Sequence, residues 1–146
     1  MAKWTIQLGA DELNALMKRE FGGTATSVGP VKRVEPGRIH VVAKYDPLML
    51  RPGGVIAGPT LMSIADTAAY NLILAHVGPE LMAVTSNLTI NFLRGAQPGD
   101  IHADAELLTL GRRLAVCDVR IWTESADRLA AQATVTYARA ASAAAA

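Results

Sequence analysis

The sequence predicts an α+β fold in which one long, largely apolar helix is covered by an antiparallel β-sheet. Apolar residues recur at helical spacing over residues 59–77, whereas the chain from residue 82 onward alternates apolar and polar residues between short turns. The 146 residues suffice for one substantial core, and the sequence contains no internal repeat. We therefore expect one domain over residues 1–139, followed by an alanine-rich tail at residues 140–146.

The N-terminal part is expected to form a shorter helix and two strands. Residues 9–21 place leucines and a methionine at helical spacing, and two glycines at positions 22 and 23 follow as a stop signal. Residues 31–45 alternate well enough for two strands, and the Glu-Pro-Gly-Arg segment at 35–38 suits the turn between them. A helix and a hairpin are thus expected ahead of the long helix.

A loop rich in glycine and proline, at residues 51–59, leads directly into the long helix. Pro59 suits the first helical position because its missing N–H would be unpaired there, and Gly78 with Pro79 is typical of a helix end. The helix carries one acid, Asp66, and a carboxylate in a buried helix is costly unless something pairs, solvates or uses it. The free N–H groups at the helix start can bind an anion. An acid close to an oxyanion-binding loop suggests chemistry at a carbonyl group.

The C-terminal half is expected to supply most of the sheet. Its first strand alternates so that Leu88, Ile90 and Phe92 share one face. The expected strands are residues 82–93, 101–110, 114–123 and 129–138, with turns at residues 97–100, 111–113 and 125–127. Such a sheet has an edge strand and an open face, which often pair with a second subunit. We therefore expect an oligomer.

Composition and motifs argue against several classes of function. A net charge of +1 provides no broad basic face, so we expect no nucleic-acid partner. The most apolar stretch, residues 60–77, is interrupted by polar residues, so we expect no membrane partner, and the N-terminus lacks the layout of a signal peptide. The single cysteine, Cys117, excludes an internal disulfide and agrees with a cytoplasmic location. The three histidines are scattered, so we expect no metal site.

Three blocks of sequence carry a family resemblance. They are Ala-Gly-Pro-Thr-Leu-Met-Ser-Ile-Ala-Asp-Thr-Ala at residues 57–68, Thr-Ser-Asn-Leu-Thr-Ile-Asn-Phe-Leu-Arg at residues 85–94, and the Gly-Asp pair at 99–100 followed by Gly-Arg-Arg at 111–113. From about residue 30 to 139 the chain resembles the hotdog-fold acyl-CoA thioesterases of the phenylacetate-degradation type. The resemblance implies the hotdog fold, a long central helix wrapped by an antiparallel β-sheet.

The resemblance also implies a reaction and its two main catalytic groups. An acyl-CoA would be hydrolysed to a carboxylic acid and free coenzyme A. The family's carboxylate corresponds to Asp66, as general base on a water or as nucleophile, and its oxyanion donor to the backbone N–H of Gly58. A preorganised N–H of this kind can contribute about 3–4 kcal/mol to transition-state stabilisation. In the family, helix and loop come from different subunits, so the resemblance implies a homodimer, and further a dimer of dimers.

Substrate-binding residues follow from the same resemblance. Thr85 and Ser86 would lie near the acyl or pantetheine path, Tyr70 could orient water or substrate from one turn after the acid, and Arg51 could present a cation to the carbonyl. The coenzyme A phosphates would be bound by arginine forks, Arg94, Arg112 and Arg113. Coenzyme A is part of the substrate, and no separate cofactor is expected.

The chain departs from the family pattern at three positions, which keeps other functions open. The family's histidine is Ala57 here, its second glycine is Pro59, and its asparagine falls at Arg51. One alternative is a non-catalytic protein that binds acyl-CoA, or a structural hotdog protein. A hydratase or dehydratase acting on β-hydroxyacyl thioesters is a weaker alternative, because those enzymes use a histidine near this loop. The acyl group and the carrier, coenzyme A or acyl carrier protein, are left open by the sequence.

Overall fold

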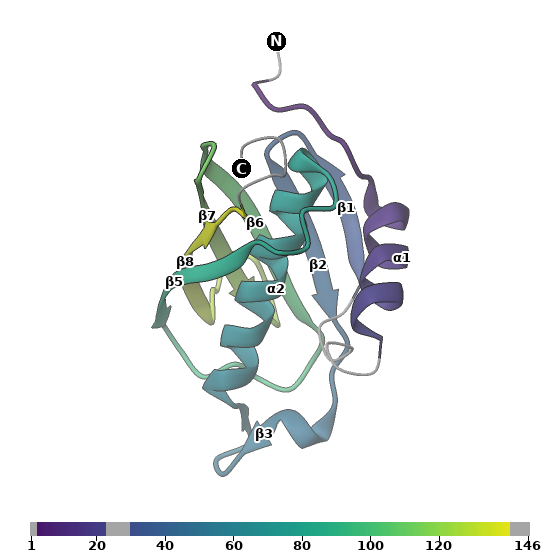
Figure 1. Cartoon of the computed structure of the whole chain (residues 1–146). Helices are drawn as coiled ribbons and strands as arrows, with labels where there is room; N and C mark the ends of the chain where they lie inside the picture. Colours follow the sequence, from purple (N-terminus) through teal and green to yellow (C-terminus); the bar gives the residue numbers. More distant parts are fainter. Residues whose placement is uncertain (1–2, 23–29, 141–146) are drawn as a thin grey trace.

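Figure 1 shows the computed structural model, which describes residues 3–22 and 30–140. Over these residues the chain forms two helices, α1 (Ala10–Phe21) and α2 (Gly58–Val77), against a six-stranded antiparallel sheet. The six strands of this sheet are β1 (Val31–Glu35), β2 (Arg38–Ala43), β5 (Val84–Phe92), β6 (Ile101–Leu110), β7 (Leu114–Trp122) and β8 (Ala131–Ala138), and two short strands, β3 (Leu50–Arg51) and β4 (Val55–Ile56), pair separately. The predicted α+β layer is confirmed. Residues 141–146 of the alanine-rich tail lie outside the described residues.

The sheet runs in the order β1-β2-β6-β7-β8-β5, so β1 and β5 are its edges, and α2 crosses its inner face (Figure 1). Alternate residues of β6, β7 and β8 are buried against the helix, as their sequence alternation predicts. Many of these buried residues are alanines, and so are buried helix residues such as Ala65 and Ala68. Short side chains on both sides let helix and sheet approach closely.

The central helix α2 ends where the sequence predicts and begins one residue earlier, at Gly58, with Pro59 in its first turn. Its end is fixed by Gly78, which has a φ of 88° and whose N–H donates to the Leu74 carbonyl at 2.9 Å. Twelve of its twenty residues are buried. A polar side chain on such a helix needs a partner or a function, which directs attention to Asp66.

The shorter helix α1 packs beside α2 and the start of β1 (Figure 1). Leu13 and Leu16 bury its apolar side. Asn14 fixes it to the sheet: its Nδ2 donates to the Val31 carbonyl at 2.9 Å, and its Oδ1 accepts from the Val31 N–H at 2.8 Å. The helix is therefore held by both burial and a pair of hydrogen bonds.

The segment expected to be a loop ahead of α2 contains local structure that the sequence analysis missed. Asp46 caps a 3-10 turn, η1 (Pro47–Met49), by accepting from the Leu48 N–H at 2.9 Å. The two-residue strands β3 and β4 then form a small hairpin, and Gly53 and Gly54, both at positive φ, make its turn. Strands this short depend on surrounding contacts, which the sequence pattern does not display.

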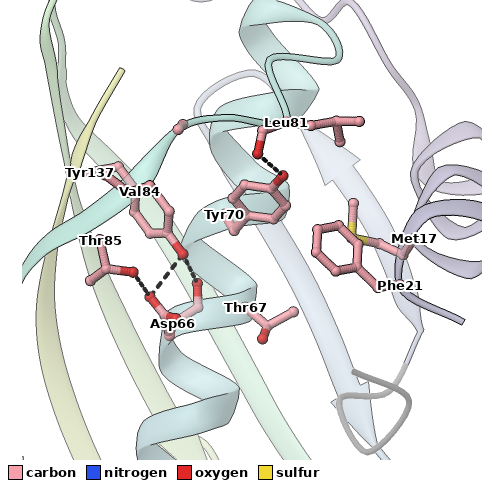
Figure 2. Close-up of a pocket in the computed structure, with 10 residues that line it drawn as sticks. Met17, Phe21, Asp66, Thr67, Tyr70, Leu81, Val84, Thr85 and Tyr137 are labelled. Atoms are coloured by element: carbon pink, nitrogen blue, oxygen red, sulfur yellow. Dashed lines mark hydrogen bonds between the residues drawn. The ribbon is translucent and has the colours of Figure 1, made fainter. Parts of the chain in front are cut away.

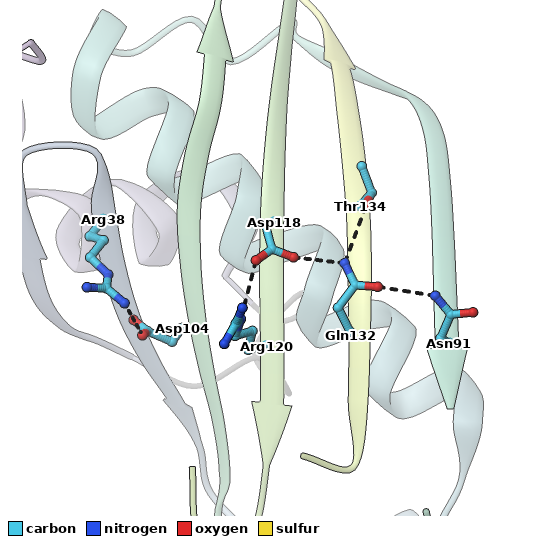
Figure 3. A network of polar contacts seen from close by, with 7 residues as sticks. All are labelled: Arg38, Asn91, Asp104, Asp118, Arg120, Gln132 and Thr134. Atoms are coloured by element: carbon cyan, nitrogen blue, oxygen red, sulfur yellow. Dashed lines mark hydrogen bonds and ion pairs between the residues drawn. The ribbon is translucent and has the colours of Figure 1, made fainter. Parts of the chain in front are cut away.

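The outer face of the sheet is polar (Figure 3). Asp104 pairs with Arg38 at 3.2 Å, and Asp118 pairs with Arg120 at 3.4 Å. Gln132 links three strands, because its Nε2 donates to Asp118 at 2.8 Å and its Oε1 accepts from Asn91 at 3.2 Å. Within the residues described, no helix is long and apolar enough to cross a membrane.

Candidate active site

Asp66 lies midway along α2, half-buried, on the side that faces β5 and β8. Two hydroxyl groups from different strands donate to the same carboxylate oxygen (Figure 2): Thr85 Oγ1 at 2.6 Å and Tyr137 Oη at 2.8 Å from Oδ1. No hydrogen bond joins the second oxygen, Oδ2, to the part of the chain that the structure describes. The carboxylate is therefore held at one oxygen and has the other free for chemistry.

A β-bulge in β5 directs Thr85 toward Asp66. Leu88 on β5 is opposite the buried Val135 on β8, so strict alternation would turn residue 86 inward and Thr85 outward. Instead Asn87 pairs with Thr136 and Thr85 with Tyr137, and Ser86 is the extra residue between them. The bulge reverses the alternation, as bulges near functional sites often do. Thr85 and Tyr137 consequently reach the helix together.

Tyr137 was not predicted as a site residue. Burial, with the negative charge of Asp66 adding to it, raises the pKa of the Tyr137 phenol, so the group remains protonated and acts as a donor at any physiological pH. Its role depends on the pairing of β5 with β8, which are far apart in the sequence. The one signal in the sequence is a polar-tipped aromatic residue on the apolar side of the last strand.

A cavity of about 320 Å³ adjoins Asp66. Its lining comes from both helices, from β5 and β8, and from the connection between α2 and β5, namely Met17, Phe21, Asp66, Thr67, Tyr70, Leu81, Ala83, Val84, Thr85 and Tyr137. Tyr70 stands in the middle of it (Figure 2) and its hydroxyl donates to the Leu81 carbonyl at 2.9 Å. Tyr70 therefore contributes its ring to the cavity, while its hydroxyl proton is engaged by the backbone.

Gly58 is the first residue of α2, and its N–H is available for an oxyanion. No hydrogen bond joins this N–H to any described residue, Pro59 has no N–H, and the Thr60 N–H is engaged by the Ala57 carbonyl at 3.1 Å. Phe92 packs beside the glycine, where an added Cβ would stand 3.2 Å from the ring. The free donor and the close contact both fit a glycine at this position.

Gly58 and Asp66 are too far apart to act on one carbonyl within a single copy of the chain. Eight residues separate them along α2, which at 1.5 Å per residue is about 12 Å. A second cavity of about 380 Å³ lies near Gly58 at the start of the helix, lined by Asp46, Leu48, Met49, Pro59, Thr60, Ser63 and Ile64. The two functional groups predicted from the sequence thus stand beside two different cavities.

Two further predicted contacts lie outside the cavity beside Asp66. Arg51 is exposed on the β3–β4 hairpin, where its Nε donates to the Pro52 carbonyl at 3.3 Å. Ser86, the bulge residue, donates from Oγ to the Thr136 carbonyl at 3.4 Å. Of the four predicted substrate contacts, the structure brings Thr85 and Tyr70 to Asp66 within one copy and places these two elsewhere.

The three arginines predicted to bind coenzyme A lie toward opposite ends of the sheet, measured along the direction of β5. Arg94 follows its Phe92 end, with Nε donating to the Leu129 carbonyl at 3.2 Å. Arg112 and Arg113 are exposed in the turn between β6 and β7, and register pairing through β8 puts this turn at the Val84 end. The length of β5, nine residues, separates the ends by about 30 Å. One coenzyme A cannot contact all three in a single copy.

The histidines stand away from Asp66. His76 is buried, where its Nε2 accepts from the Gly37 N–H at 2.9 Å. On the outer face, His40 Nε2 and His102 Nδ1 are 3.1 Å apart, and His102 stacks on Trp122. Burial first, then the adjacent His102, lowers the pKa of His40 from 6.5. Among the described residues, no group of three or more histidine, cysteine, aspartate or glutamate side chains could hold a metal ion.

Comparison with known proteins gives a consistent result. The family model described as the thioesterase superfamily matches residues 53–130. The fold is similar to that of a candidate thioesterase from Silicibacter sp. TM1040, with 32% identity, a TM-score of 0.84 and coverage of 92% of this chain and 94% of that one. A candidate thioesterase related to phenylacetic acid degradation, from Ralstonia eutropha JMP134, is 26% identical with a TM-score of 0.70, covering 75% of this chain and 83% of that one. A candidate esterase of Saccharolobus solfataricus is 25% identical over 130 residues, which are 89% of this chain and 85% of that protein.

Proposed function

This chain belongs to the thioesterase superfamily, and from that premise we propose that it hydrolyses acyl-CoA thioesters to a carboxylic acid and free coenzyme A. One observation carries the proposal: the Asp66 carboxylate is held at Oδ1 by two hydroxyl donors, while Oδ2 stays free at a largely apolar cavity. An apolar cavity with a few convergent polar groups suits an acyl group whose carbonyl carbon must be attacked.

Two routes are open to Asp66. As general base, Oδ2 takes a proton from a water whose oxygen attacks the thioester carbonyl; collapse of the tetrahedral intermediate expels the coenzyme A thiolate, which then takes up a proton. As nucleophile, Oδ2 attacks the carbonyl carbon, the C–S bond breaks and the coenzyme A thiolate leaves and takes up a proton; water then hydrolyses the resulting anhydride to the carboxylic acid and the free Asp66 carboxylate. Either route places negative charge on the carbonyl oxygen, where the Gly58 N–H would stabilise it.

The complete site in this proposal is formed by two copies of the chain. The separation of about 12 Å between Gly58 and Asp66 supports it, since neither group can serve the other's carbonyl within one copy. The edge strand β5 also exposes apolar side chains on and beside it: Met82 is 75% exposed, Val84 59%, Phe92 52% and Leu93 54%. Antiparallel pairing of β5 with β5 of a second copy would cover them.

The same pairing would gather the remaining predicted contacts. Because Arg94 lies at one end of β5 and Arg112 and Arg113 at the other, antiparallel pairing brings one copy's Arg94 near its partner's turn arginines, as a shared coenzyme A phosphate site requires. Arg51 and Ser86 would then contact substrate held mainly by the other copy. We propose a homodimer on this basis, with a dimer of dimers as its further assembly, in the cytoplasm.

The reaction is tested by thiol release from a panel of short, medium, long and aryl acyl-CoA esters. Wild type is compared with Asp66→Asn, which keeps the shape of the side chain, and with Asp127→Asn, which changes an exposed acid in a turn. We expect Asp66→Asn to lose at least about a hundredfold in kcat and the control to match wild type. Label found in Asp66 after a single turnover in ¹⁸O-water would establish the nucleophile route, since water that attacks the aspartyl carbonyl of the anhydride leaves its oxygen there, whereas the general-base route labels only the released acid.

Two outcomes of this assay would contradict the proposed reaction. Turnover that survives Asp66→Asn would overturn the mechanism. Tight binding of the esters without turnover by wild type would instead favour the non-catalytic acyl-CoA binder, in which Ala57 and Arg51 replace the polar residues of the family pattern. The free oxygen of Asp66 beside the cavity is the observation that favours the enzyme.

The shared site is tested by complementation. Asp66→Asn and Gly58→Val, whose side chain would crowd Phe92 and the N–H, are each expected to be inactive as pure proteins. Co-expressed copies form mixed dimers in which one of two sites has an intact Asp66 and an intact Gly58. Recovery of roughly a quarter of wild-type activity is expected for random pairing, whereas no recovery would place the whole site in one copy.

A further inference from the structure

The cavity beside Asp66 has a polar side and an apolar side (Figure 2). Asp66, Thr85 and the Tyr137 hydroxyl form the polar side. Beyond the ring of Tyr70, the wall is made by Met17 and Phe21, both from α1. A thioester that places its carbonyl at Asp66 therefore directs the remainder of its acyl group toward α1.

Aromatic contacts define the shape of this wall. Phe21 meets Tyr70 edge to face, with ring centroids 5.9 Å apart at 89°, and Tyr70 lies 5.6 Å from Tyr137 at 35°. The Tyr70 hydroxyl is fixed to the Leu81 carbonyl, so the middle ring cannot swing aside without breaking that bond. Met17, the other side chain at the α1 side, is unbranched and therefore adaptable in shape.

The helix that carries this wall is held firmly. Leu13 and Leu16 are buried, and Asn14 exchanges two hydrogen bonds with the backbone of Val31. Enlarging the cavity by moving α1 would expose both leucines and break both bonds. The distance from Asp66 to the α1 wall is therefore a built-in limit.

The volume of the cavity indicates which acyl groups fit between Asp66 and the α1 wall. The cavity is largely open to solvent, and its 320 Å³ is about twice the 150 Å³ of an enclosed cavity that holds benzene, so the space between Asp66 and α1 can accommodate a single aromatic ring with its linker, or a chain of roughly six to eight carbons. From this geometry we infer that Met17 and Phe21 of α1 set the upper size of the acyl group. This inference rests on the proposed function and names the residues that determine its specificity.

The inference is tested by kcat/KM for straight-chain acyl-CoA esters from two to sixteen carbons, together with benzoyl- and phenylacetyl-CoA. Wild type is expected to decline beyond roughly eight carbons. Met17→Ala should shift the decline by roughly two to four carbons, with at least a tenfold gain for the first esters that wild type rejects, since one methylene in an apolar pocket is worth roughly 10- to 200-fold. Met17→Trp should shift it the other way.

Lys18→Ala is the matched control, because Lys18 lies on the same helix, is exposed, and does not line the cavity. It is expected to leave the chain-length profile unchanged. An unchanged profile in folded Met17→Ala and Met17→Trp, or an equal shift in Lys18→Ala, would overturn the inference.

Binding measurements with unreactive analogues test this inference independently of the proposed reaction. S-alkyl-CoA thioethers of four to twelve carbons cannot be hydrolysed, and their affinities can be measured by calorimetry for wild type and both Met17 variants. If wild type hydrolyses no ester, the proposed function fails, and the thioethers decide alone. A longest bound alkyl group that moves with residue 17 supports the inference, and one that does not move contradicts it.

Discussion

The two hydroxyls on Asp66 make a quantitative prediction. Tyr137→Phe and Thr85→Val each remove one donor to Oδ1 with little change of shape. Distances of 2.8 and 2.6 Å are typical of hydrogen bonds to a charged acceptor, which are worth about 1.5–3 kcal/mol each. At 1.36 kcal/mol for each factor of ten in rate, losing the whole of one bond would cost about 10- to 150-fold.

Since both donors serve the same oxygen, either one alone still restrains the carboxylate. We therefore expect each single variant to lose about tenfold in kcat, and the double variant to lose more than the product of the two, because only then is the carboxylate free to turn. The loss should fall on kcat more than on KM, because neither hydroxyl is free to bind the ester in the ground state.

Tyr70→Phe is the control, since it removes a hydroxyl from the same cavity that bonds Leu81 rather than Asp66. Its kcat should stay within about threefold of wild type. If Tyr137→Phe and Thr85→Val both fold and both retain kcat within about twofold while Asp66→Asn is inactive, the hydroxyls do not position the acid, and the reasoning is wrong. Equal losses in Tyr70→Phe would assign the effect to cavity structure.

Three further predictions concern the rest of the fold. The pKa of His40 is lowered below 6.5 in the folded chain, so on acidification the unfolded chain binds the extra proton first. The contribution of His40 to the free energy of unfolding is therefore fully present above about pH 6.5 and is lost as the pH falls toward the lowered pKa. Urea midpoints measured between about pH 8 and 5 should depend less on pH in His40→Gln than in wild type. Gly37→Ala should lower the free energy of unfolding by about 1–3 kcal/mol, measured by denaturant titration, since Gly37 has a φ of 77° and a Cβ there would collide with Trp4. Burial raises the pKa of Cys117 to about 12, so a disulfide reagent at about pH 8 should leave the native thiol unmodified and titrate one thiol per chain in denaturant.

Local signals in the sequence account for most of the fold. Apolar periodicity with Pro59 and Gly78 at its ends located α2, and alternation between turns located β5 to β8 within a few residues. The β3–β4 hairpin was missed because it depends on contacts such as the Ala57 N–H to the Met49 carbonyl at 2.9 Å. Such contacts leave no periodic pattern in so short a segment.

The sequence predicted a candidate site residue only where a single side chain did not fit its expected surroundings. A lone acid on a buried helix pointed to Asp66, and Thr85 was placed near the substrate path through the family resemblance. Tyr137 was missed because its role follows from a contact between a strand and a helix across 71 residues, and the bulge at Ser86, which turns Thr85 toward the same acid, is not predicted by alternation. Tyr70 was expected to orient water or substrate, whereas its hydroxyl donates to a backbone carbonyl.

The edge strand connects the proposed chemistry to assembly. β5 contributes Thr85 to the anchoring of Asp66, yet among the described strands it pairs with β8 alone. Pairing with a second copy would cover its apolar side chains and fix the bulge that directs Thr85 toward Asp66. It would also bring a Gly58 N–H from the second copy, which is needed because the Gly58 of the same copy lies about 12 Å from Asp66. Dilution that separates the copies is therefore expected to abolish turnover while far-ultraviolet circular dichroism still reports a folded chain. Turnover per chain that stays constant through dissociation would contradict the shared site.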